Sequence, residues 1–154
     1  MMAPVITYSR FTDFDIDLFK SGKHYRLYEK FGSHVMNIDG VKGTYFAVWA
    51  PSAKTVSVIG DFNFWTENEH QLQVRWDSSG IWEGFIPGVA HGATYKYKIQ
   101  SSHNNIVAEK ADPYARRCEH PPRTGSIVYD YKPKWNDKEW MKSRKKNNAL
   151  DAPY

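Results

Sequence analysis

Cysteine is almost missing from this sequence: Cys118 is the only one in 154 residues. A single cysteine excludes an intramolecular disulfide and any metal site made of several thiolates. Hydrophobic runs are also short, and none approaches the roughly 18 residues of a membrane-spanning helix. The first residues, MMAPVITYSRFTDF, lack the basic region and long apolar stretch of a secretory signal. We therefore expect no membrane partner and, by default, a cytoplasmic protein.

Catalytic and metal-binding motifs are missing as well. The sequence has no glycine-rich phosphate loop, no paired-histidine metal motif and no nucleophile elbow. Its histidines are scattered, and no two are spaced i, i+4 as two ligands on one helix face would be. The carboxylates of Glu67, Glu69 and Glu83 are interpreted as solvated surface groups. We expect no catalytic residue, no metal and no cofactor in this chain.

The excess of positive charge is small. Lysine and arginine number 21 against 17 aspartate and glutamate, a net charge of +4, and much of the excess lies between Lys142 and Lys146. Such a run is typical of a solvated helix face or tail, and no nucleic-acid-reading motif accompanies it. Nucleic acid is therefore not an expected partner.

Aromatic residues, in contrast, are abundant, at 16% of the chain. With 41% hydrophobic and 25% charged residues, the composition is that of a globular protein, and the length suits one domain or one domain with tails. The high aromatic share indicates that some rings do more than fill a core.

Residues 1–31 are predicted to form a short helical arm. Phe14, Leu18 and Phe19 are spaced i, i+4, i+5, and a second short helical pattern ends at Phe31. We expect the apolar side of this arm to pack on a larger body.

From residue 32 the hydrophobic period changes to two, which is typical of strands. Turn residues separate roughly seven or eight short strands. The expected strands lie at 34–38, 43–50, 55–60, 71–77, 81–87, 94–100, 106–107 and 126–129. This pattern predicts an all-β, immunoglobulin-like antiparallel β-sandwich over residues 32–132. Residues 133–154 are predicted to hold a charged C-terminal helix, at 136–148, and a linker.

Side-chain alternation assigns the faces of these strands. Tyr95, Tyr97 and Ile99 share one face of their strand, so Lys96, Lys98 and Gln100 lie on the opposite, outward face. Three tryptophans on strand faces are expected in the core: Trp49, Trp76 and Trp82.

One polar loop carries three large rings, Phe62, Phe64 and Trp65, directly after a strand. In one interpretation, Phe62 and Phe64 plug the end of the sandwich and Trp65 caps it. In the other, Trp65 presents its flat face to the apolar C–H face of a sugar ring.

Sugar hydroxyls next to Trp65 would need hydrogen-bonding groups. Asn63 lies two residues away, and the outward Lys96 is a suitable charged donor. The candidate carbohydrate-binding residues are therefore Trp65, Lys96 and Asn63.

The stretch GTYFAVWAPSAKTVSVIGDFNFW, residues 43–65, closely resembles the N-terminal module of bacterial glycogen (1,4-α-glucan) branching enzymes. The resemblance continues in order with GIWE at 80–83, FIPG at 85–88, YKYK at 95–98 and ADPYA at 111–115. The FAVWAP strand and FNxW loop alone are typical of family-48 carbohydrate-binding modules, which isoamylases also carry. The DPYA segment and the DAPY ending at 151–154 select the branching-enzyme group.

This resemblance implies a longer enzyme with an α-amylase-type (β/α)8 barrel. In that family the barrel cleaves an α-1,4-glucan through a covalent glycosyl-carboxylate intermediate and transfers the segment to a 6-hydroxyl. The catalytic Asp and Glu lie on barrel loops that this chain does not contain. The module is then expected to position the barrel and to hold α-1,4-glucan such as glycogen.

The resemblance also bears on the candidate residues. Trp65 matches the FNxW tryptophan that stacks on glucose in glycogen-binding relatives, and Lys96 matches the lysine of their YK pair. Those relatives use a second tryptophan in the turn after that strand, but here the turn, SSHNN at 101–105, contains none. Their asparagine in the final loop is also missing between residues 123 and 126. Sugar binding is therefore expected in the millimolar range, about −4 kcal/mol.

Three functions remain open at this point. The chain is a module that mainly positions a branching-enzyme barrel, a free-standing glycogen-binding module, or a β-sandwich interaction domain without a sugar role in which Trp65 anchors a protein partner.

Overall fold

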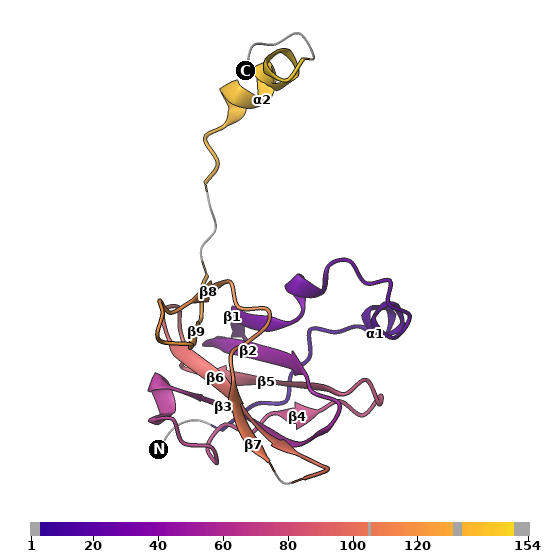
Figure 1. Cartoon of the computed structure of the whole chain (residues 1–154), viewed down its shortest axis with the longest axis vertical. Helices are drawn as coiled ribbons and strands as arrows, with labels where there is room; N and C mark the ends of the chain where they lie inside the picture. Colours follow the sequence, from indigo (N-terminus) through magenta and orange to yellow (C-terminus); the bar gives the residue numbers. More distant parts are fainter. Residues whose placement is uncertain (1–3, 105, 131–133, 150–154) are drawn as a thin grey trace.

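The computed structural model describes residues 4–104, 106–130 and 134–149. Within these ranges the chain forms two antiparallel sheets (Figure 1). The first sheet has the order β1-β2-β5-β4, with bounds Gly32–Ile38, Val41–Trp49, Ile81–Pro87 and Gln73–Val74. The second has the order β3-β6-β9-β8, with bounds Ala53–Gly60, Thr94–Ser101, Ser126–Ile127 and Arg117–Cys118, and β7, Val107–Lys110, also pairs with β6. The predicted all-β antiparallel sandwich is confirmed.

The core between the sheets follows the predicted alternation of side chains. Tyr95 and Tyr97 of β6 are completely buried, and they meet inward residues of β2 and β5 such as Phe46 and Ile86. β2 lies between β1 and β5, as expected for a strand that is apolar on both faces. The inward positions of β3 and β6 leave their alternate residues on the outer face of the second sheet.

The N-terminal arm covers the outer face of the first sheet. Phe11, Ile16 and Phe31 from the arm form a second buried cluster with Tyr45 and Phe85. The larger body on which the arm was expected to pack is therefore this sheet. The arm thus shares a core with the sheet. The predicted domain bounds, 1–31, 32–132 and 133–154, stay a prediction.

Helix α1, Asp13–Lys20, begins with a capping box in which the Thr12 hydroxyl accepts from the backbone of Asp15. The Asp15 carboxylate is buried and pairs with Lys30 at 2.7 Å and His24 at 2.9 Å. Burial raises the pKa of Asp15, but hydrogen bonds from Lys30, Thr12 and His24 outweigh burial and hold the pKa below its ordinary value. These contacts turn Asp15 and Ile16 toward the sheet.

The prediction that Phe14 lies on the apolar, packed side of α1 is wrong. Phe14 is 70% exposed, whereas Ile16 is buried. The reason is the capping box: since Asp15 is fixed against Lys30, the neighbouring Phe14 points to solvent. A 3₁₀ turn at Leu27–Glu29 follows, where the sequence predicted a second short helical pattern.

Of the three tryptophans expected in the core, only Trp82 is buried. Trp76 is 86% exposed, because β4 ends at Val74 and the next residues form a loop. Trp49 is also exposed: it ends β2, and its indole nitrogen donates to the Ser79 carbonyl at 2.9 Å.

Helix α2, Lys138–Asn147, confirms the predicted C-terminal helix. It contains no buried residue and stands away from the two sheets in Figure 1. The predicted DAPY ending, residues 151–154, lies outside the described residues, as does Asn105 of the turn after β6.

Because His34 on β1 is buried, we expect the free energy of unfolding to depend on pH. Burial lowers the pKa of its imidazole to about 4 from 6.5, and the charges of Arg10 and Arg116 act in the same direction. Since the unfolded chain takes up this proton at higher pH than the folded chain, the stability contributed by neutral His34 is complete above pH 6.5. It is lost as the pH falls through 6.5 toward 4.

We therefore expect unfolding in urea to show a decrease of about 1–2 kcal/mol between pH 7 and pH 5. His34→Gln should remove most of this slope, because an amide can still donate to the Phe31 carbonyl that His34 contacts at 2.8 Å. The same slope in wild type and variant would show that another group is responsible.

Candidate functional site

The aromatic loop begins where β3 ends. After Gly60 the chain makes a 3₁₀ turn at Asp61–Asn63, and Phe64 and Trp65 then adopt left-handed conformations with φ of 52° and 61°. Two consecutive bulky residues in this region cost about 1–3 kcal/mol each, and such conformations persist only where neighbouring contacts impose them.

The buried side chain of Asn63 fixes the conformation of the 3₁₀ turn and of the two residues after it. Its oxygen accepts from the Gly60 backbone at 2.9 Å, and its nitrogen donates to the Val58 carbonyl at 2.8 Å and lies 2.9 Å from Nδ1 of His70. Asn63 is completely buried, so the prediction that it contacts a sugar is wrong. Gly60 is needed at the start of the turn because a Cβ there would overlap the Thr94 carbonyl.

The three rings of the loop have different environments. Phe62 is partly buried against the core, with Phe46 and His70 as ring neighbours, as predicted for a plug. Phe64 is 85% exposed, so its predicted role as a plug is wrong. Trp65 is 39% exposed, and its backbone N–H donates to the Gly60 carbonyl at 3.0 Å. Trp65 is thus anchored and yet accessible.

Lys96 lies on the outer face of β6, as alternation predicted, and is partly exposed. Its Cα partner is Ile59, the residue before Gly60, so the register puts Lys96 beside the end of β3 from which the Trp65 loop departs. The candidates Trp65 and Lys96 are therefore brought to the same end of one sheet face, while Asn63 supports the loop from the interior.

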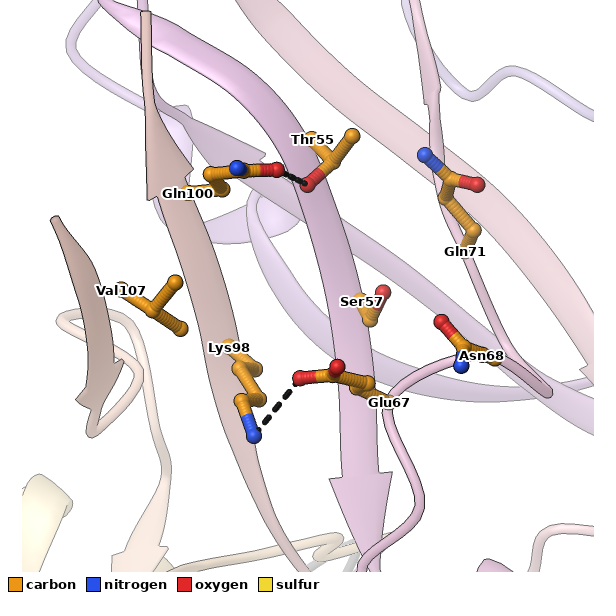
Figure 2. Close-up of a pocket in the computed structure, with 8 residues that line it drawn as sticks. All are labelled: Thr55, Ser57, Glu67, Asn68, Gln71, Lys98, Gln100 and Val107. Atoms are coloured by element: carbon orange, nitrogen blue, oxygen red, sulfur yellow. Dashed lines mark hydrogen bonds and ion pairs between the residues drawn. The ribbon is translucent and has the colours of Figure 1, made fainter. Parts of the chain in front are cut away.

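A polar pocket continues along this face (Figure 2). It has a volume of about 210 Å³. Its lining residues come from β3, β6, β7 and the segment between β3 and β4: Thr55, Ser57, Glu67, Asn68, Gln71, Lys98, Gln100 and Val107. Lys98 and Glu67 form an ion pair of 2.7 Å across it.

Sequence reasoning did not single out this pocket. Alternation placed Lys98 and Gln100 on the outward side, which was the available signal. Alternation also placed Gln71 on the polar side of its predicted strand, but its place next to β3 depends on an isolated bridge to Ser57.

An exposed indole beside outward lysine, hydroxyl and amide groups, on the face of an antiparallel sandwich, is an arrangement suited to sugar rings. The class defined by this fold and site is a carbohydrate-binding β-sandwich module. A family model described as "Carbohydrate-binding module 48 (Isoamylase N-terminal domain)" matches residues 30–115, and the chain belongs to this family.

Among known sequences, the chain is similar to proteins named 1,4-alpha-glucan branching enzyme GlgB. It is 49% identical over 145 residues to that of Thermosynechococcus vestitus, a match that covers 94% of this chain and 18% of the relative. The corresponding protein of Aquifex aeolicus is 47% identical, with 95% of this chain and 23% of the relative covered. The chain thus spans about a fifth of the length of these relatives.

Among solved structures, the chain is similar to a pullulanase of Klebsiella pneumoniae complexed with maltotriose. The TM-score is 0.52 and the identity 25%, over 66% of this chain and 10% of that one. The described part of this chain contains no helix long and apolar enough to cross a membrane. In the same residues, no group of three or more His, Cys, Asp or Glu side chains is arranged to hold a metal.

Proposed function

We propose that this chain is the N-terminal module of a 1,4-α-glucan branching enzyme and binds α-1,4-glucan on the outer face of β3 and β6. The observation that carries the glucan site is the accessible Trp65, held in a left-handed turn by the buried Asn63 at the end of the face that bears Lys96. The names of the similar branching enzymes, and the maltotriose complex of the similar pullulanase, support a glucan as the ligand.

The chemistry of the site suits a neutral sugar. The indole of Trp65 covers the apolar C–H face of a glucosyl ring, and the ammonium of Lys96 donates hydrogen bonds to ring hydroxyls. With one exposed tryptophan at the face instead of two, binding is weak, with a Kd in the millimolar range, about −4 kcal/mol.

Removal of the Trp65 ring tests this site. Titration with maltoheptaose, followed by calorimetry, is expected to show at least about tenfold weaker binding for Trp65→Ala than for wild type. Its folding should be little changed, because the ring is partly exposed. Trp76→Ala is the matched control, since it deletes an exposed indole from another loop. Equal binding by wild type and Trp65→Ala would contradict the site.

In the longer enzyme, the branching chemistry belongs to a catalytic (β/α)8 domain outside this chain, and the module positions that domain. The exposed aromatic residues of the arm and tail, Phe14, Tyr25, Trp135 and Trp140, support a role in packing against another domain. Glycogen metabolism and the lone exposed cysteine suit a cytoplasmic location. Reading the encoding gene beyond Tyr154 tests this part of the proposal, and a barrel sequence is the expected result.

A further inference from the structure

The polar pocket beside the Trp65 loop is built from rows of residues that the strand register sets opposite one another. Ser57 pairs with Lys98, and Thr55 pairs with Gln100, at successive outward positions of β3 and β6. The row of Ile59 and Lys96 precedes them at the Trp65 end. Figure 2 shows the side chains of Thr55, Ser57, Lys98 and Gln100 on one face, with Gln71 on the neighbouring segment.

These rows extend the face well beyond one sugar ring. Gln100 lies four positions after Lys96 along β6, which at the rise of an antiparallel strand is about 13 Å. A glucosyl unit stacked on Trp65 therefore leaves the rest of a glucan chain lying over the pocket, if the chain follows the strands.

The lining of the pocket offers both donors and acceptors. Lys98 and the amides of Asn68, Gln71 and Gln100 donate, and the Glu67 carboxylate accepts. In the part of the chain that the structure describes, the side chains of Asn68 and Gln71 make no hydrogen bond to protein. Their amides are consequently available to a ligand.

The charges in the pocket select against an ionic ligand. The hydrogen bond from Lys98 to Glu67 raises the pKa of the ammonium, and Glu109 lies opposite Lys98 on β7. The positive charge of Lys98 is thus already balanced, so a phosphate would meet no net attraction. Val107 is the one aliphatic side chain larger than alanine among the lining residues, so an apolar peptide segment fits poorly.

The Lys98–Glu67 ion pair can also rearrange around a ligand with little loss of stability. Both the Lys98 and the Glu67 side chains are partly exposed, and ion pairs at such surface positions contribute little to stability. Their ammonium and carboxylate can therefore hydrogen-bond vicinal hydroxyls of a sugar while they stay close to each other.

We infer that this pocket is a second glucan subsite, in which Lys98, Glu67, Gln71 and Gln100 hydrogen-bond the hydroxyls of the glucosyl units that follow the unit on Trp65. The inference rests on the proposed function of the Trp65 site. It assigns to polar side chains of the sheet face the role of holding a longer chain, which a single tryptophan cannot perform.

The test is the dependence of affinity on glucan length. Wild type is titrated by calorimetry with maltose, maltotriose and maltoheptaose, in parallel with Lys98→Met, which keeps the aliphatic stem and removes the donor. Wild type should bind maltoheptaose about tenfold more tightly than maltose. In Lys98→Met the affinity for maltoheptaose should fall by a similar factor, so that the ratio of the two affinities approaches one.

Lys110→Met is the matched control. Lys110 lies on β7 with Tyr97 as its Cα partner, so it points to the opposite side of the sheet from Lys98. It should behave as wild type at every length. If Lys98→Met does not fold, Glu67→Gln and Gln100→Ala replace it, with the same expected flattening.

The outcomes separate the two claims. If Trp65→Ala loses binding while Lys98→Met, Glu67→Gln and Gln100→Ala keep the length dependence of wild type, the subsite is refuted and the Trp65 site stands. If wild type binds no glucan of any length, the proposed function fails and the subsite fails with it.

Discussion

Asp112→Ala is expected to lower the free energy of unfolding by about 3–5 kcal/mol. The Asp112 carboxylate is buried and accepts hydrogen bonds from the hydroxyls of Tyr95 at 2.6 Å and Tyr97 at 3.1 Å and from the backbone of Tyr114 at 2.8 Å. Alanine leaves two buried phenol groups without this acceptor. Because domains are stable by about 5–15 kcal/mol, this is a large part of the total. Urea denaturation followed by circular dichroism measures it.

Three further variants locate the origin of this loss. Tyr95→Phe and Tyr97→Phe each remove one donor and should cost about 1 kcal/mol, with the larger effect at Tyr95 because its hydrogen bond is shorter. Asp17→Ala deletes an exposed carboxylate and should be close to neutral. Were Asp112→Ala as stable as Asp17→Ala, the buried network would have no energetic role.

Asn63→Ala is expected to lower the free energy of unfolding by about 2–3 kcal/mol and to weaken glucan binding as well. Without the carboxamide, the Gly60 N–H and the Val58 carbonyl lose their partner, and nothing below the turn imposes the left-handed conformations of Phe64 and Trp65. The indole then samples other positions. Denaturation gives the first effect and titration with maltoheptaose the second.

The combination of the two effects distinguishes positioning from contact. Trp65→Ala should change the affinity alone, whereas Asn63→Ala should change both quantities. Asn37→Ala, at an exposed position of β1, is the matched control and should change neither. An Asn63→Ala variant with normal affinity for maltoheptaose would show that the turn keeps its shape without the side chain.

Much of the fold could be predicted from local patterns. The strand expected at 81–87 is β5, with the same bounds, and the alternation in β6 separates the buried Tyr95 and Tyr97 from the outward Lys96. Such predictions succeed because a strand in a two-sheet sandwich must bury one face, so period two appears directly in the sequence. They fail where a strand stops early. The alternation of the sequence continues to Trp76, but the hydrogen-bonded ladder of β4 ends at Val74.

The candidate site was predicted in part for a related reason. Strand alternation suffices to place Lys96 on the outward face of its strand. The position of Trp65 in a loop suffices to predict that its ring is accessible. Asn63 shares that loop, but its burial depends on hydrogen bonds to Val58 and His70 that no spacing reveals.

The sequence by itself determined that this chain is a β-sandwich, which side of β6 faces outward, and that an aromatic loop follows β3. Only the tertiary structure decided that the N-terminal arm covers the first sheet, that Asn63 is buried while Phe64 is exposed, and that Glu67 and Gln71 join Lys98 in one pocket. The physical reason is that hydrophobic alternation records which residues are buried within a single strand. The partners of a side chain are set instead by chain segments far apart in sequence, whose approach depends on how the whole sandwich packs.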